Sequence, residues 1–70
     1  MNWKFDDNVN VRSGPSTQTK KVEQYHPGET VKLDQIHYTN NEKWGSYIGG
    51  SGQRRYVCLE KDGESYGHRY

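Results

Sequence analysis

The stretch WGSYIGGSGQRRYVCL, residues 44–59, predicts a β-hairpin. Its first half is rich in aromatic and β-branched residues, which favour strands. The glycine-rich centre, GGSG, supplies the positive φ angles that tight hairpin turns need. In the second half Val57 and Leu59 alternate with more polar neighbours, and a period of two sends the two sets to opposite faces of a strand. If the aliphatic pair faces the core, Tyr56 lies on the exposed face.

Other parts of the chain show the same alternation and no helical periodicity. Val9 and Val11 alternate with polar residues, and residues 21–25 form a short candidate strand that a Pro-Gly turn follows. In residues 31–38 the apolar positions change parity at residues 34–35, which predicts a bulge or a sharp bend. About five to seven short antiparallel strands separated by turns are typical of a sandwich or a small barrel. We therefore expect an all-β fold.

The composition limits the chain to one small domain with a thin core. It has 70 residues, of which 29% are hydrophobic and 13% aromatic, and a chain of this length buries only about 60% of its unfolded surface. The formal net charge is +1, whereas nucleic-acid-binding domains are usually strongly basic. The single cysteine excludes an internal disulfide and a Cys-based zinc cluster. No segment approaches the ~20 apolar residues that span a bilayer, so we expect no membrane partner.

No pattern of catalytic or metal-binding residues stands out. The three histidines, His26, His37 and His68, lack the spacing of metal ligands. The GGSG stretch lacks the Lys-Ser/Thr ending and the following helix of a phosphate-binding loop. Cys58 lies between two aliphatic residues, which favours a packing role over that of a nucleophile. We expect no enzymatic activity, no metal and no cofactor.

Two motifs resemble a known family. VNVRSGPS, residues 9–16, is similar to the opening strand and loop of bacterial SH3-like domains. Residues 44–57 are similar to the Trp–Tyr–Ser–Gly–Arg–Tyr stretch in the cell-wall-targeting domains of lysostaphin-type enzymes and phage endolysins. The step of ten residues from Asp34 to Trp44 also fits that family.

The resemblance implies an architecture and a function. The architecture is a small SH3-like barrel that forms one domain over residues 1–70, with its core in residues 8–59 and a tail in residues 60–70. The function is that of a non-catalytic module that binds the stem or bridge peptides of peptidoglycan in a Gram-positive wall. A catalytic domain, an amidase or endopeptidase, is then expected on the parent chain, as in a phage endolysin. Because the start of the chain lacks the apolar segment of a secretory signal, we expect such a protein to be made in the host cytoplasm and to act at the cell wall.

The resemblance also implies a ligand groove between the first loop and the middle strands. Aromatic faces, together with amides and hydroxyls that pair with a peptide backbone, hold an extended peptide well, and tyrosine combines an apolar face with a polar tip. The implied ligand-binding residues are Asn10, Arg12, Gln35, His37, Tyr38, Trp44, Tyr47, Tyr56 and Tyr66, with Tyr70 as a further candidate.

Other interpretations of these residues stay open. Trp44 either lines the groove or fills the core. The basic doublets Lys20-Lys21 and Arg54-Arg55 are typical of solvated surface. Basic residues interleaved with tyrosines also fit a nucleic-acid-binding small β-barrel, which is the alternative function. A third class, an adaptor for proline-rich peptides, requires a denser aromatic and acidic surface than this sequence offers. Exposed aromatic residues on a thin core favour a homo-oligomer.

Overall fold

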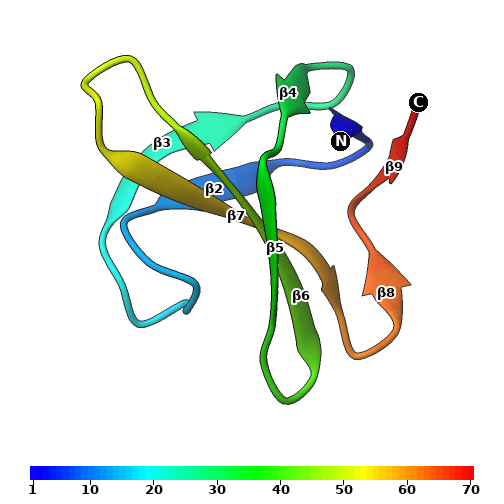
Figure 1. Ribbon diagram of the computed structural model, residues 1–70. Coiled ribbons are helices and arrows are strands. Elements are labelled where there is room, and N and C mark those ends of the chain that lie inside the picture. Colours follow the sequence, from blue (N-terminus) through cyan, green and yellow to red (C-terminus); the bar gives the residue numbers. More distant parts are fainter.

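The computed structural model describes all 70 residues and contains only β-strands (Figure 1). The nine strands are β1 (Asn2–Phe5), β2 (Val9–Arg12), β3 (Lys21–Tyr25), β4 (Thr30–Lys32), β5 (Gln35–Tyr38), β6 (Glu42–Ile48), β7 (Arg54–Lys61), β8 (Glu64–Ser65) and β9 (Gly67–Arg69). The expected all-β class and the antiparallel pairing are confirmed. The strand count exceeds five to seven because β1, β8 and β9 form in the terminal segments. The chain contains no helix that could cross a membrane.

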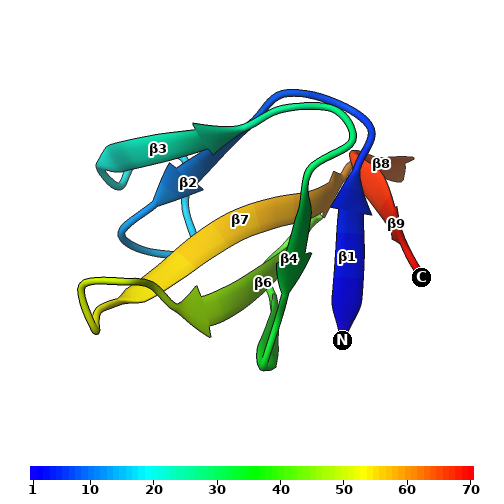
Figure 2. The ribbon, with the colours of Figure 1, turned by 90° about the horizontal axis from the view of Figure 1, so that it is seen from above.

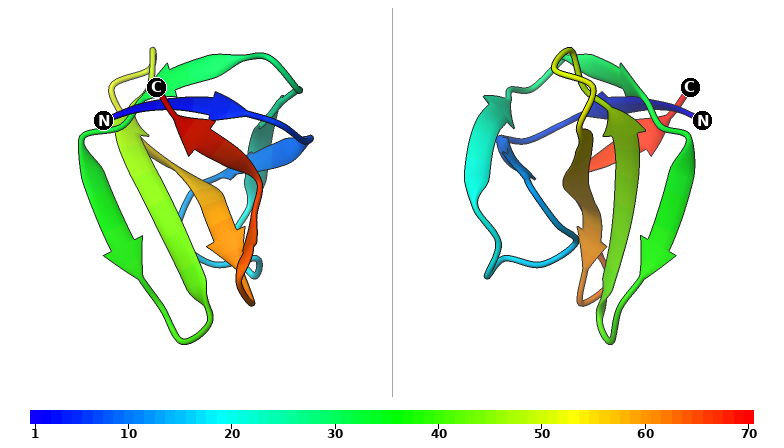
Figure 3. Two further views of the ribbon diagram at one scale, coloured as in Figure 1. Left: turned by 90° about the vertical axis from the view of Figure 1, so that its right-hand side faces the viewer. Right: turned by 60° about the vertical axis from the view of Figure 1, so that its left-hand side comes forward.

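The strands form two sheets. The larger sheet has six strands in the order β3-β2-β7-β6-β5, with β8 paired to β7 outside this path. The smaller sheet has three strands in the order β4-β1-β9. Figure 2 shows β1, β4 and β9 side by side, next to the long β6–β7 hairpin, and Figure 3 shows the two sheets closing into a small barrel. Closure leaves few free sheet edges, which a small β domain must protect.

The hairpin predicted from residues 44–59 is the longest paired unit of the barrel. Strands β6 and β7 pair antiparallel from Glu42↔Lys61 to Ile48↔Arg54, with one irregularity between Lys43 and Trp44. Gly52 in the connecting turn has a φ of +83°, a conformation that glycine adopts without steric cost. Val57 and Leu59 are completely buried, whereas Tyr56 is half-buried on the other face. The alternation read from the sequence therefore describes this strand correctly.

The change of parity at residues 34–35 marks a sharp bend. Strand β4 ends at Lys32, which pairs with Asn2 in the small sheet, and β5 begins at Gln35, which pairs with Ser46 in the large sheet. Leu33, between the two strands, is 3% exposed and packs in the core. The chain passes from one sheet to the other at this point, so the apolar positions before and after the bend face the same core from different sheets.

The core begins earlier in the chain than the expected residues 8–59. Trp3 and Phe5 alternate along β1 and are 5% and 0% exposed, and Phe5 stacks on Tyr25 with the ring centroids 4.6 Å apart. The core cluster consists of Trp3, Phe5, Val9, Val11, Leu33, Val57 and Leu59. A short aromatic strand supplies its two largest side chains, because a thin barrel gains most burial per residue from aromatic rings.

Residues 60–70, expected as a tail beyond the core, pair with the strands of the barrel. Strand β8 pairs with the end of β7, and β9 pairs with β1, Trp3 opposite Arg69 and Phe5 opposite Gly67. The backbone N–H of Tyr70 donates to the carbonyl oxygen of Asn2 at 3.3 Å. The first and last residues therefore lie next to each other, as Figure 2 shows.

Candidate functional site

Four side chains form a row across the outer face of the large sheet. Strand pairing aligns Arg12 of β2 with Tyr56 of β7, Tyr56 with Ser46 of β6, and Ser46 with Gln35 of β5. Residues directly opposite each other in an antiparallel pair project from the same face. Val11 and Val57 project to the opposite face and are buried. The row therefore lies on the side of the sheet away from the core.

His37 joins this row beside Tyr56. The two rings lie 5.3 Å apart between centroids at an interplanar angle of 52°. His37 Nε2 lies 2.7 Å from the hydroxyl oxygen of Ser46, which is completely buried. Arg54 Nη1 donates to the same hydroxyl at 3.0 Å and to the Asp34 carboxylate at 2.5 Å. These contacts hold the His37 ring beside Tyr56. We call Arg12, Tyr56, Ser46, Gln35 and His37 together the Tyr56 row.

A groove lies next to the Tyr56 row, between the first loop (residues 13–20) on one side and the start of β6 and the end of β7 on the other. It consists of two hollows of about 180 Å³ and about 330 Å³ that share Glu42 and Lys61 in their walls. The smaller hollow is lined in part by Asn10, Arg12, Trp44, Cys58 and Tyr66. We call the two hollows together the first-loop groove, and Arg12 belongs both to it and to the Tyr56 row.

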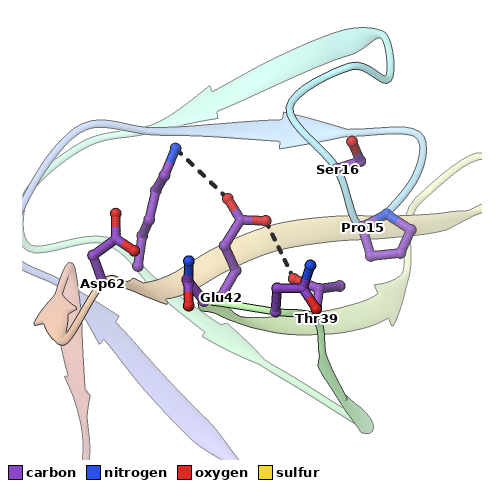
Figure 4. A pocket seen from close by; sticks show the side chains of 8 residues that line it. Pro15, Ser16, Thr39, Glu42 and Asp62 are labelled. Atoms are coloured by element: carbon purple, nitrogen blue, oxygen red, sulfur yellow. Dashed lines mark hydrogen bonds and ion pairs between the residues drawn. The ribbon is translucent and has the colours of Figure 1, made fainter.

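Polar and charged residues line the larger hollow, apart from Pro15. Figure 4 shows Pro15 and Ser16 of the first loop on one side, facing Thr39, Glu42 and Asp62 on the other. The Glu42 carboxylate accepts from Thr39 Oγ1 at 3.3 Å and lies 3.7 Å from Lys61 Nζ. Hydroxyls, amides and carboxylates here are suited to the N–H and C=O groups of an extended peptide.

Hydrogen bonds hold the first loop in place as a wall of the groove. Arg12 Nη1 donates to the carbonyl oxygen of Thr19 at 2.9 Å. The Thr19 hydroxyl contacts the carbonyl oxygens of Ser16 at 2.6 Å and Gly14 at 3.0 Å. Arg12 therefore has a structural contact as well as a place in the candidate site.

Trp44 forms the floor of the first-loop groove. It is 1% exposed, lies on the same face as Ser46 two residues on, and is not a member of the core cluster. Its indole N–H donates to Glu42 Oε1 at 3.1 Å. Trp44 therefore combines the two roles that its sequence left open: its ring is buried like a core residue, but it lies below the groove and not in the central core.

Two further groups at the groove have altered acidity. Burial, followed by the Glu42 carboxylate, raises the pKa of the Cys58 thiol from 9.0 to about 11. Burial also raises the pKa of the Tyr66 hydroxyl. Both groups are therefore neutral at physiological pH, and the thiol is a poor nucleophile. No group of three His, Cys, Asp or Glu side chains in the chain is arranged to hold a metal ion.

Three of the sequence candidates lie elsewhere. Tyr70 follows β9 of the small sheet, is 65% exposed and lines neither hollow of the groove. Tyr47 is three positions from Trp44, so it projects to the opposite face, where it packs against the core and meets Tyr25 at 6.5 Å between centroids. Tyr38 is 75% exposed at the end of β5, with Lys43 Nζ 6.0 Å from its ring centroid. The remaining candidates, Asn10, Arg12, Gln35, His37, Trp44, Tyr56 and Tyr66, lie in the Tyr56 row or the first-loop groove.

Sequence reasoning missed three residues that organise the site. Ser46, Glu42 and Lys61 each contact or adjoin the candidates named above. Ser46 carried a usable signal, because it shares parity with Trp44 on one strand. Glu42 and Lys61 come together only through the pairing of β6 with β7, and no local pattern indicates that pair.

Comparisons with known proteins agree with this architecture. The family model described as the bacterial SH3 domain matches residues 1–59. Probable autolysin PH of Staphylococcus aureus (strain NCTC 8325 / PS 47) is 40% identical over 49 residues, which are 70% of this chain and 10% of that protein. This chain therefore spans about a tenth of the length of that curated relative.

Two solved structures share the fold at low sequence identity. The lysostaphin SH3b P4-G5 complex matches with a TM-score of 0.86 at 21% identity, over 96% of this chain and 81% of that chain. The cell wall targeting domain of the peptidylglycan hydrolase ALE-1 matches with a TM-score of 0.82 at 21% identity, over 96% of this chain and 76% of that chain. The expected SH3-like barrel is thereby confirmed.

Proposed function

Since the chain belongs to the bacterial SH3 domain family, we propose that it is a non-catalytic module that binds peptidoglycan and targets a hydrolase to a Gram-positive cell wall. The proposal agrees with the relatives, which include an autolysin and the cell wall targeting domain of a peptidylglycan hydrolase. The nucleic-acid-binding alternative has no such support, and Arg54, half of one basic doublet, is paired with Asp34.

One observation carries the proposal: the Tyr56 row and the first-loop groove meet at Arg12. Together they offer aromatic rings, a guanidinium group, side-chain amides and hydroxyls along one side of the barrel. An extended peptide has flat amide planes and alternating N–H and C=O groups, which pair with such a surface. An enzyme active site would instead need a nucleophile or a pair of acid and base groups, and the groove offers a neutral, half-buried thiol.

The proposed ligands are the stem peptide and the interpeptide bridge. Each contact is weak by itself, because ordering a flexible peptide costs much of the contact energy. The wall presents such peptides as a dense array, and a tethered module gains avidity from repeated rebinding. Weak binding to single fragments and firm binding to intact wall are therefore expected together.

The parent protein is proposed to carry a peptidoglycan amidase or endopeptidase, as in a phage endolysin or an autolysin. The chain covers a tenth of the autolysin relative, which leaves room there for other domains. In this arrangement the module supplies attachment at the wall and the partner domain supplies the bond cleavage.

A fluorescent fusion of the domain tests the proposal. It should decorate purified sacculi of a Gram-positive host, and Tyr56→Ala should reduce the bound fluorescence at least about tenfold, as for loss of a central aromatic contact. Tyr70→Ala is the matched control, because Tyr70 is 65% exposed and follows β9 in the other sheet. This variant should bind sacculi as well as the wild type does. Failure of the wild-type fusion to bind any of a panel of Gram-positive sacculi would rule the proposal out.

A further inference from the structure

The buried Ser46 hydroxyl lies at the centre of a small hydrogen-bond network. Its oxygen contacts His37 Nε2 at 2.7 Å and Arg54 Nη1 at 3.0 Å, and the residue is 0% exposed. Arg54 is also paired with Asp34, which anchors the guanidinium group from the other side. A buried hydroxyl without access to water must use these two neighbours as its partners.

The chemistry of the partners decides where the protons lie. A guanidinium group has donors and no acceptor, so Arg54 donates to the Ser46 oxygen. The Ser46 proton then needs an acceptor, and His37 Nε2 is the one within hydrogen-bond distance. A neutral imidazole that accepts at Nε2 carries its own proton on Nδ1.

The Nδ1 side of the ring is free for a ligand. His37 Nδ1 makes no hydrogen bond within the chain. Trp3 Nε1 is the only fully enclosed side-chain nitrogen or oxygen without a hydrogen-bond partner, so His37 Nδ1 is not enclosed. It is therefore open to solvent, next to the Tyr56 ring 5.3 Å away. A donor in this position faces the surface on which the proposed peptide would lie.

We propose that Ser46 and Arg54 hold His37 as its Nδ1–H tautomer, so that His37 donates a hydrogen bond to a backbone carbonyl of the bound wall peptide. The ligand role rests on the proposed function, whereas the tautomer is a property of the free domain. The site then favours a ligand whose carbonyl oxygen lies next to the Tyr56 ring and disfavours one that places an N–H group there. His37 is thus a specificity-determining residue whose state is set by two positioning residues.

The tautomer is measured on the free domain by long-range ¹H–¹⁵N correlation spectroscopy at neutral pH. The expected spectrum has the proton of His37 on Nδ1, and free histidine measured under the same conditions is the reference for the Nε2–H form. Ser46→Ala removes the partner of Nε2 and should return His37 to the Nε2–H form that free histidine favours. A wild-type His37 protonated on Nε2 would overturn the inference, whatever the domain binds.

Two substitutions test the ligand role by titration with soluble wall peptides. Asparagine carries its amide at the position of Nδ1 and glutamine at that of Nε2, so His37→Asn keeps the proposed donor and His37→Gln keeps only the contact with Ser46. Affinity should stay within about threefold for His37→Asn and fall about tenfold for His37→Gln, the effect of one hydrogen bond. Equal affinities, or a larger loss for His37→Asn, would refute the donor role. A wild-type domain that binds no wall peptide would overturn the proposed function and the ligand role, but not the tautomer.

Discussion

Glycine at position 67 allows β9 to approach β1 closely. A Cβ atom there would meet the backbone carbonyl oxygen of Lys4 and lie 2.6 Å from Trp3 Nε1. Real Cβ atoms do not come this close to other atoms, and neither the backbone of β1 nor a packed indole ring moves away cheaply. The size of one residue therefore controls whether the small sheet closes.

Gly67→Ala should lower the free energy of unfolding by about 1–3 kcal/mol or more, the cost of overpacking. Urea denaturation followed by tryptophan fluorescence measures this loss. Gly50→Ala is the control, since a Cβ at Gly50 meets nothing within 4 Å, and it should change stability by no more than about 0.5 kcal/mol. Equal stabilities of the two variants would show that the approach of β9 to β1 is not tight.

The raised pKa of Cys58 predicts a loss of stability at alkaline pH. In the folded domain the pKa of the thiol is raised from 9.0 to about 11, mainly by burial. Between these values the unfolded chain has lost the proton that the folded domain keeps, so the unfolded state binds fewer protons and stability falls as pH rises. The raised pKa values of Tyr47 and Tyr66 act in the same direction at higher pH.

Urea denaturation across the range from about pH 7 to pH 11 checks this dependence. The midpoint should decrease through the upper half of the range, and Cys58→Ser should flatten the decrease near pH 9 to 11, because serine does not ionise there. Parallel curves for the wild type and Cys58→Ser would mean that the thiol has an ordinary pKa.

At the scale of elements, β1 is the strand on which the barrel closes. It lies between β4 and β9 and sends Trp3 and Phe5 into the core, while Lys4 faces solvent. Its sequence is short and its neighbours include acidic residues, so composition alone does not mark it as a core strand. The alternation Trp3-Lys4-Phe5 is nevertheless a period-two pattern that predicts a half-buried strand.

Phe5→Ala should cost about 3–5 kcal/mol, as for other large-to-small changes of buried aromatic residues. The loss includes the stacked contact with Tyr25, whose ring centroid lies 4.6 Å away. Lys4→Ala on the exposed face of the same strand should stay within about 0.5 kcal/mol. Thermal unfolding monitored by circular dichroism compares the two, and a stable Phe5→Ala variant would place β1 outside the cooperative core.

At the scale of the whole molecule, the two ends of the chain lie together in the small sheet, and the candidate site lies on the large one. The pairing of β1 with β9 joins the ends, whereas the Tyr56 row and the first-loop groove are built from β2, β5, β6 and β7 with their loops. A domain attached through either end is thereby compatible with a free binding surface. The expected homo-oligomer stays a prediction, which light scattering over a range of concentrations tests.

Circular permutation tests this separation. With the old ends joined by a short Gly/Ser linker, a permutant opened between Gly50 and Ser51 should fold and bind sacculi, because that turn is exposed and outside the site. A permutant opened between Ser16 and Thr17 should keep its circular dichroism spectrum and lose at least about tenfold in binding, since it breaks the wall of the groove. Full binding by the second permutant would remove the first loop from the site.

Several features of the fold were predictable because they are local. The hairpin of residues 44–59, the short strand of residues 21–25 and the bend at residues 34–35 are all marked by alternation or by turn residues within a few positions. Alternation also predicted that Val57 and Leu59 are buried and Tyr56 is not. The same rule places Trp44 and Tyr47 on opposite faces of β6, although both were expected at the ligand groove.

The all-β class, the main hairpin and the residue types of the site follow from local patterns, because a period of two and turn chemistry act over short distances. The alignment of Arg12 with Tyr56, the ion pair of Glu42 with Lys61 and the closure of β1 on β9 depend instead on how the whole chain packs. These contacts join residues far apart in the chain. Their register is set by the common core that all strands must cover once the barrel closes, and no local pattern encodes it.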